Sequence, residues 1–160
     1  MFGRFKQAPT YPADLLASRL FDESTFYQAF LNDLHRCRNE ALIESPFITS
    51  NRVASLLPIF GKMRSRGVKL TIITRDPAMH DAPFDAQAQR AVDDLLDIGV
   101  QVIYMGGHHR KLAIFDRQTL WEGSLNILSQ NDSCEIMRRI ESEVLATQMI
   151  GFTKLGKFLG

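Results

Sequence analysis

The sequence predicts an α/β fold in which a mixed, mostly parallel sheet is flanked by helices. Segments with apolar residues at helical spacing alternate with short apolar runs rich in β-branched residues. Strands joined through helices usually run parallel, so this alternation favours parallel pairing. The length of 160 residues fits one domain with a substantial core. We expect that domain over residues 22–160, after an irregular N-terminal arm over residues 1–21 that contains Pro9 and Pro12.

The domain should begin with a helix, a strand and a second helix. The first helix is expected over residues 24–38, with Ser24 as its cap, because apolar side chains recur there at helical spacing. A strand should follow over residues 40–48, where an apolar run ends in a loop. Ser50 or Asn51 is then expected to cap the second helix.

Proline and glycine divide the rest of the chain. Pro58 lies inside the apolar pattern of the second helix, which implies a kink or a later start, and Gly67 should end that helix. A third helix, with Ala88 and Leu95 facing inward, should stop at Gly99. The expected strands cover residues 68–74, 100–105, 111–116, 120–122 and 135–140, and a last helix covers residues 143–158.

Composition excludes several classes of protein. The formal net charge is +1, so no global field indicates a polyanion partner, and a basic surface must be local. Neither a signal-peptide core nor a transmembrane run occurs, and no amphipathic, strongly basic stretch marks a membrane face, so we expect a cytoplasmic protein. Cys37 and Cys134 are far apart in sequence and are expected to be reduced, buried thiols.

The stretch over residues 106–126 carries the strongest functional pattern. Its polar residues stand at fixed spacings: His109, Lys111, Asp116, Gly123, Ser124 and Asn126. Side chains two apart on a strand share a face, so His109 and Lys111 should project side by side. Gly123 and Ser124 should form a tight turn with exposed N–H groups and a hydroxyl. An imidazole, an ammonium, an amide and a hydroxyl together suit a phosphate, and no carboxylate cluster accompanies them to require Mg²⁺.

This spacing resembles the HKD motif of the phospholipase D superfamily, and residues 123–140 resemble phospholipase-D-like modules that accompany helicase and nuclease proteins. The resemblance runs from about residue 24 onward and implies a phospholipase-D-like sandwich. It implies cleavage or exchange of phosphodiesters through a covalent phosphohistidine, without metal or other cofactor. Family sites pair two HKD motifs, and this chain has one, so the resemblance also implies a homodimer with one shared site.

The resemblance assigns roles to individual residues. His109 of one subunit would attack phosphorus, while His109 of the other would protonate the leaving oxygen. Lys111 and Asn126 would bind the non-bridging oxygens. Ser124 and Gly123 would support that phosphate pocket, and Asp116 would be structural, holding its turn and the Ser124 region. An acidic residue should orient the histidine: Glu135 is our candidate, with Glu141 and Asp132 as alternatives.

We therefore expect a nuclease that acts on nucleic acid, with DNA favoured, and that works alone or with a helicase or restriction-type partner. The alternatives are a phospholipase D or phosphatidyl transferase, and a catalytically silent DNA-binding dimerisation module. Trp121 is expected in the core rather than as a base-stacking platform, and His80 at the surface, with substrate contact as its second interpretation. A basic cluster at Lys62, Arg64, Arg66 and Lys69 is either a solvated helix end or a phosphate contact.

Overall fold

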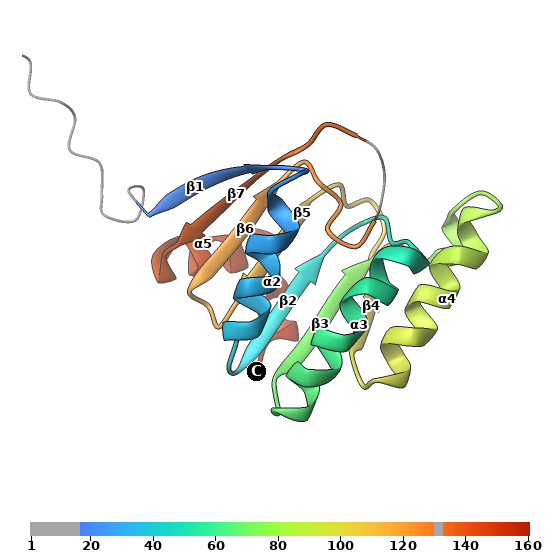
Figure 1. The fold of residues 1–160 in the computed structure, drawn as a ribbon, viewed down its shortest axis with the longest axis horizontal. Helices are drawn as coiled ribbons and strands as arrows, with labels where there is room; N and C mark the ends of the chain where they lie inside the picture. Colours follow the sequence, from blue (N-terminus) through green and yellow to red (C-terminus); the bar gives the residue numbers. More distant parts are fainter. Residues whose placement is uncertain (1–16, 130–132) are drawn as a thin grey trace, which may run out of the picture.

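A computed structural model describes residues 17–129 and 133–160 as one α/β unit built on a single sheet (Figure 1). The helices are α2 (Phe26–Arg36), α3 (Ser50–Ser65), α4 (Phe84–Asp97) and α5 (Glu143–Thr153), with 3-10 turns η1 (Pro77–Met79) and η2 (Leu155–Phe158). The strands are β1 (Ser18–Asp22), β2 (Glu40–Glu44), β3 (Lys69–Thr74), β4 (Gln101–Tyr104), β5 (Lys111–Phe115), β6 (Thr119–Gly123) and β7 (Ile136–Glu141). Among the described residues, no helix is long and apolar enough to cross a membrane.

The sheet has seven strands in the order β1-β7-β6-β5-β2-β3-β4, with β1 and β4 at its edges (Figure 1). Only β2–β3 and β3–β4 are parallel pairs, and the other neighbours are antiparallel. The α/β class and the mixed sheet are confirmed, but the expectation of mostly parallel pairing is wrong. The physical reason is that β5, β6 and β7 follow one another through loops, without the helical crossover that parallel pairing needs.

The structure begins its first strand earlier than expected, because residues 18–22 form β1 and pair with β7 from Ser18↔Ile140 to Asp22↔Ile136. The prediction that residues 1–21 are irregular is therefore wrong for this segment, and residues 1–16 lie outside the described part of the chain. This edge strand is largely exposed, with Leu20 at 70% exposure, so it lacks the alternation of buried and exposed residues by which a strand is recognised in a sequence.

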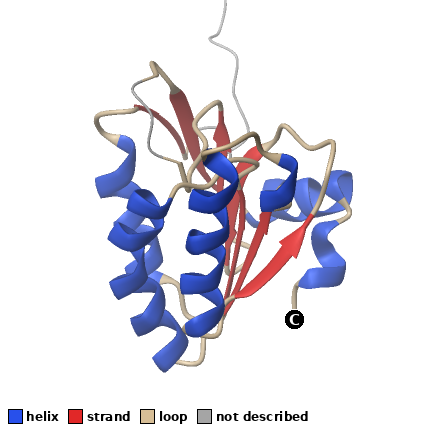
Figure 2. Ribbon diagram, turned by 90° about the vertical axis from the view of Figure 1, so that its right-hand side faces the viewer, coloured by secondary structure: helices blue, strands red, loops and turns tan. Residues whose placement is uncertain are grey.

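Helices cover both faces of the sheet (Figure 2). The larger core cluster joins α2, α3 and α4 to one face, and it includes Ala113 and Phe115 of β5. The smaller cluster joins α5 and η2 to the other face through residues such as Leu112 and Ile140. Alternate residues of β5 therefore belong to opposite layers, which fixes the direction in which Lys111 leaves the strand.

A buried polar contact ties α2 to the antiparallel half of the sheet. Asp33 of α2 is 5% exposed and accepts hydrogen bonds from Trp121 Nε1 at 2.8 Å and from Arg139 Nε at 2.7 Å. Phe26 packs edge-on against the Trp121 ring at 5.1 Å. The prediction that Trp121 belongs to the core is confirmed, and its one polar atom is satisfied there.

The helix ends differ in detail from the sequence prediction. The N-cap residue of α2 is Thr25, so Ser24 is not the cap. The carboxylate of Asp22 accepts the N–H groups of Ser24 and Thr25 in the turn before the helix. The cap residue of α3 is Thr49 and the helix begins at Ser50, so the prediction of Ser50 or Asn51 as the cap is wrong. The helix continues through Pro58, so the predicted later start is also wrong.

Two later helix ends show how the backbone stops a helix. Gly67, at φ +83°, ends α3 as predicted, since a side chain there would be strained. The last helix is shorter than expected: α5 ends at Thr153, and Lys154 adopts φ 57° before the 3-10 turn η2.

Candidate active site

The candidate site lies at the open end of the β5–β6 hairpin. The register pairs Lys111 with Gly123 at this end and Phe115 with Thr119 at the other. A tight turn closes the far end, where Asp116 has φ 51° and the next residue φ 53°. The hairpin therefore brings the start of β5 directly beside the end of β6, although these residues are separated by the whole motif.

His109 lies just before β5, in agreement with the strand expected over residues 111–116. The alternation of side chains along a strand therefore does not fix the direction of its ring. The His109 side chain is exposed, and Lys111 Nζ donates a hydrogen bond to the His109 carbonyl oxygen at 2.7 Å. The lysine thus holds the backbone of the histidine, while the imidazole is open to solvent and available to a substrate.

Ser124 and Glu135 form the second part of the site. The Ser124 amide donates to the Ile136 carbonyl at 3.0 Å, and the Ser124 hydroxyl accepts from the Ile136 amide at 3.1 Å. The expected free N–H group at Ser124 is therefore used inside the fold. Hydrogen bonds from the Ser124 and Ser133 hydroxyls lower the pKa of Glu135, and the positive charge of Lys111 lowers it further. Glu135 is thus an ionised carboxylate beside the candidate lysine.

Asn126 lies in the loop after β6, and this loop is held by β2 and its following turn. The Leu128 amide donates to the buried Ser45 Oγ at 3.1 Å, and the Thr49 amide donates to the Leu128 carbonyl at 2.9 Å. Tyr27 Oη donates to the Ile127 carbonyl at 2.9 Å. Asn126 Oδ1 is buried and has no hydrogen-bond partner in the structure. An unpartnered buried oxygen on a rigid loop is a group that a ligand would satisfy.

Gly123 is required by close packing rather than by an unusual φ. A Cβ atom added there would overlap the Ile136 carbonyl oxygen and lie 2.7 Å from Met137 Sδ and 2.9 Å from Met137 Cα. Without a side chain, β6 approaches β7 closely, and this approach allows Ser124 to reach Ile136. Gly123 thus supports the site by letting these two strands meet.

Asp116 has a structural role, but at the opposite end of the hairpin from Ser124. Its carboxylate accepts the amides of Arg38 at 2.8 Å, Asn39 at 2.8 Å and Glu40 at 3.0 Å. It therefore holds the turn between α2 and β2, and the prediction that it holds the Ser124 region is wrong. Burial would raise the pKa of Asp116, but these amide donors outweigh that effect and lower it.

Glu141 and Asp132 were the alternatives to Glu135 as the acidic residue that orients His109. Glu141 pairs with Thr119 at the closed end of the hairpin and accepts a hydrogen bond from Arg139 Nη1 at 3.2 Å. It therefore lies at the wrong end of β7 for contact with His109. Asp132 lies outside the described residues.

Sequence reasoning missed a charged cluster that flanks His109. Glu44, at the end of β2, is 1% exposed and receives two hydrogen bonds of 3.0 Å from Arg110 Nε and Nη2. His108 Nδ1 lies 3.2 Å from the same carboxylate. The two neighbours of His109 are thus both fixed to one buried group. A glutamate closing an otherwise apolar strand was the available signal, since such a residue is rarely buried unpaired.

The basic cluster and the two cysteines lie away from the site. The basic cluster lies at the end of α3 and the start of β3, where Arg64 Nη1 donates to the Val68 carbonyl at 2.7 Å and Arg66 Nη2 to the Cys37 carbonyl at 3.3 Å. Cys37 is a buried free thiol as expected, whereas Cys134 is free but exposed. Among residues 17–129 and 133–160, no group of three or more His, Cys, Asp or Glu side chains is arranged to hold a metal.

A known protein family matches most of this chain. A family model described as "Cardiolipin synthase, PLD-like domain" matches residues 30–154, which include every motif residue discussed above. Among curated proteins, the chain is 29% identical over 110 residues to cardiolipin synthase A of Buchnera aphidicola subsp. Schizaphis graminum. That match covers 67% of this chain but only 22% of the relative, so the chain spans about a fifth of that protein's length.

Two solved structures share the fold over nearly their full length. Nuc from Salmonella typhimurium, a phospholipase D family member, superposes with a TM-score of 0.70 at 14% identity, covering 84% of this chain and 90% of its own. NucT from Helicobacter pylori gives a TM-score of 0.65 at 18% identity, with 86% and 92% covered. At these identities the likeness establishes the phospholipase-D-like fold alone.

Proposed function

The chain belongs to the phospholipase-D-like domain family, and on that premise we propose that it is a metal-independent phosphodiesterase that cleaves nucleic acid through a phosphohistidine. The observation that carries the proposal is the gathering of Lys111, Ser124 and Glu135 beside the exposed His109 at one end of the hairpin. An ammonium next to a nucleophilic imidazole stabilises the charge that grows on a phosphate during transfer.

Each residue has a defined task in the proposed reaction. A ring nitrogen of His109 bonds to phosphorus as the bond from phosphorus to the leaving oxygen breaks, and a protonated histidine gives that oxygen its proton. Water then attacks the phosphohistidine, its proton passes to the second histidine, and the P–N bond breaks to release a phosphate monoester. Lys111 and the Asn126 amide bind the non-bridging oxygens, and Glu135, held by Ser124, orients the histidine.

The second histidine implies a homodimer, because the sequence contains one His-x-Lys pair with the required spacing. We propose that two copies of the open hairpin end face each other across a two-fold axis. Since one imidazole must be neutral and the other protonated, the rate should rise and then fall with pH. A rate that changes in only one direction between mildly acidic and mildly basic pH would contradict the paired histidines.

The decisive assay is cleavage of plasmid and single-stranded DNA in excess EDTA, with His109→Ala as the matched control. Cleavage by the wild type and its loss in the variant are expected. Labelled substrate quenched at alkaline pH should leave phosphate on His109. Light scattering should give twice the subunit mass. No cleavage by either protein would reject the nuclease. Tight, salt-sensitive DNA binding without turnover would instead support the silent module.

Phosphatidyl transfer is the second candidate, and the likeness to cardiolipin synthase A favours it. The same nucleophile and phosphate-binding groups would serve a phospholipid diester, with an alcohol replacing water. Headgroup release from phosphatidylglycerol vesicles, with DNA left intact under the same conditions, would select this function over the nuclease. Action together with a helicase or restriction-type partner remains a further proposal, for which co-purification is the test.

A further inference from the structure

A pocket of about 540 Å³ is lined by Asn126 together with residues that have no task in the proposed reaction. Asn126 connects the pocket to the proposed site, since it is one of the proposed phosphate-binding residues and it also lines the pocket. The other walls come from the turns that follow β2 and β3, and they include Phe47, Arg75 and His80. A volume of this size falls within the range of roughly 300–1,000 Å³ that small-molecule sites occupy.

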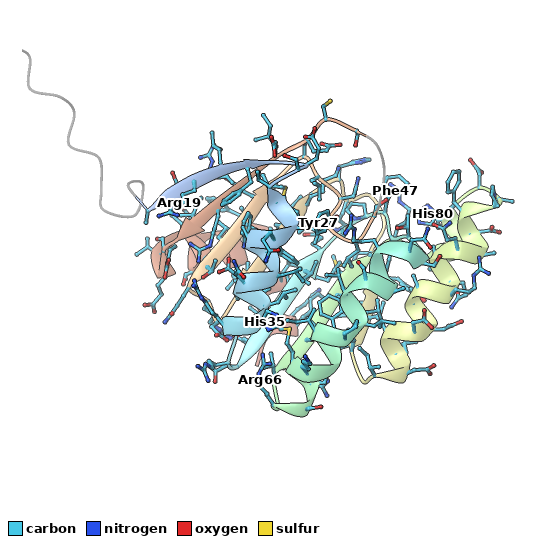
Figure 3. The ribbon with its side chains drawn as sticks, in the orientation of Figure 1. Arg19, Tyr27, His35, Phe47, Arg66 and His80 are labelled. Carbon is cyan, nitrogen blue, oxygen red and sulfur yellow. The ribbon has the colours of Figure 1, made fainter. Side chains whose placement is uncertain are left out.

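The pocket presents an aromatic surface toward solvent. The rings of Phe47 and His80 lie 5.3 Å apart at an angle of 42°, and Figure 3 shows them side by side at one end of the molecule. Phe47 is 42% exposed, and the Arg75 guanidinium lies 5.0 Å from the centre of its ring. An exposed ring beside a cation is the arrangement on which nucleobases stack.

Two buried polar atoms of the pocket's lining residues lack partners. They are Asn126 Oδ1 and His80 Nε2. Burial and the neighbouring charge of Arg75 lower the pKa of His80, so its ring is neutral at neutral pH. A lipid chain in the pocket would leave both atoms unsatisfied, which is unfavourable for buried polar groups. The edge of a nucleobase carries both donors and acceptors and would satisfy them.

Arg75 connects this pocket to a neighbouring hollow. The second hollow, of about 440 Å³, is lined by Arg75, Gly106 and Gly107, and the two glycines lead directly to the segment that carries His109. A guanidinium between two hollows suits the phosphate that links two nucleotides.

We propose that the pocket binds the nucleobase of the nucleotide next to the scissile phosphate. Phe47 is the stacking platform, and Asn126 Oδ1 and His80 Nε2 bond to the base edge. This inference rests on the proposed nuclease function, and it adds that the enzyme holds the base as well as the phosphate. This proposal uses the second interpretation of His80, in which it contacts the substrate.

The test compares two probes with the same phosphates, using His109→Ala protein so that neither is cleaved. One probe is a fluorescein-labelled oligothymidylate of about eight nucleotides, and the other is an abasic strand of equal length. Fluorescence anisotropy should show the oligothymidylate bound about 10-fold more tightly. Phe47→Ala should abolish this difference, and Phe47→Trp should retain it. Phe152→Ala is the control, because that ring is 75% exposed on α5 and should not affect the ratio.

Equal affinity for both probes, or a ratio unchanged by Phe47→Ala, would overturn the base pocket. Displacement of oligothymidylate by soluble short-chain phosphatidylglycerol in a Phe47-dependent manner, with no base discrimination, would overturn it in favour of a lipid. The two proposals fail separately. Wild-type cleavage without base discrimination removes the pocket and keeps the nuclease, whereas base discrimination without cleavage removes the nuclease and keeps the pocket.

Discussion

The two ends of the β5–β6 hairpin share one motif but have opposite properties. At the open end, His109 is exposed and Lys111 is half-buried, and the lysine donates a hydrogen bond to the His109 carbonyl oxygen. At the closed end, Asp116 is fixed by three backbone amides of another segment. The motif therefore combines chemistry and scaffolding. The four strand residues 112–115 separate Lys111 from Asp116, so changes at one end should leave the other intact.

Loss of the His109 ring should have the largest effect. His109→Ala should reduce phosphodiester cleavage roughly a thousand-fold or more, because the nucleophile is removed. Its thermal stability should match the wild type, since the side chain is exposed and the Lys111 bond goes to the backbone carbonyl. Single-turnover cleavage and calorimetry measure the two quantities. A large drop in melting temperature would show that the open end is also structural.

Loss of the Asp116 carboxylate should produce the opposite result. Asp116→Ala leaves amides in the turn between α2 and β2 without their acceptor and should lower the free energy of unfolding by about 3 kcal/mol, or roughly 6–12 °C. Cleavage per folded molecule should persist at low temperature. Asp97→Ala, at an exposed carboxylate at the end of α4, is the control. A variant that is stable but inactive would refute the division of tasks.

Substitution of Glu44 should affect both stability and cleavage, because Glu44 fixes both neighbours of His109. Glu44→Gln weakens the bonds to Arg110 and His108 and should lower the free energy of unfolding by about 2 kcal/mol. The loss is limited because the partly exposed arginine regains contact with water. We expect cleavage to fall about 10-fold in kcat with little change in KM, because the histidine is held less firmly. An effect confined to KM would argue that Glu44 acts on substrate binding instead.

Low pH should destabilise the closed end of the hairpin, and this is the smallest of the predicted effects. The pKa of Asp116 is lowered in the folded state, so its contribution is complete above the unfolded value of about 4. This contribution to stability is lost as the pH falls from about 4 through the pKa of Asp116 in the folded state. Urea titrations between about pH 5 and pH 2 should therefore show a steeper loss of stability in the wild type than in Asp116→Asn. Parallel curves would mean that solvent screens this carboxylate completely.

Much of the fold could be predicted because it follows from local patterns. Helical spacing located α2, α3 and α4 to within a few residues, and β-branched residues located β3. The motif located the segment that carries His109, Lys111 and Ser124. The edge strand β1 could not be found, because it packs too little apolar surface to show a pattern. Glu44 and the pocket around Phe47 were also missed, since neither has a regular sequence spacing to the motif.

The amino-acid sequence by itself determined most of the elements and the residues available for chemistry, because periodicity and backbone preferences act over a few residues. Only the tertiary structure decided the strand directions, the partners of Asp116 and the placement of Asn126 beside Phe47. These depend on contacts between segments far apart in the chain, such as Asp116 with Arg38, which are 78 residues apart. Such contacts are selected by the packing of the whole sheet, and no local pattern encodes them.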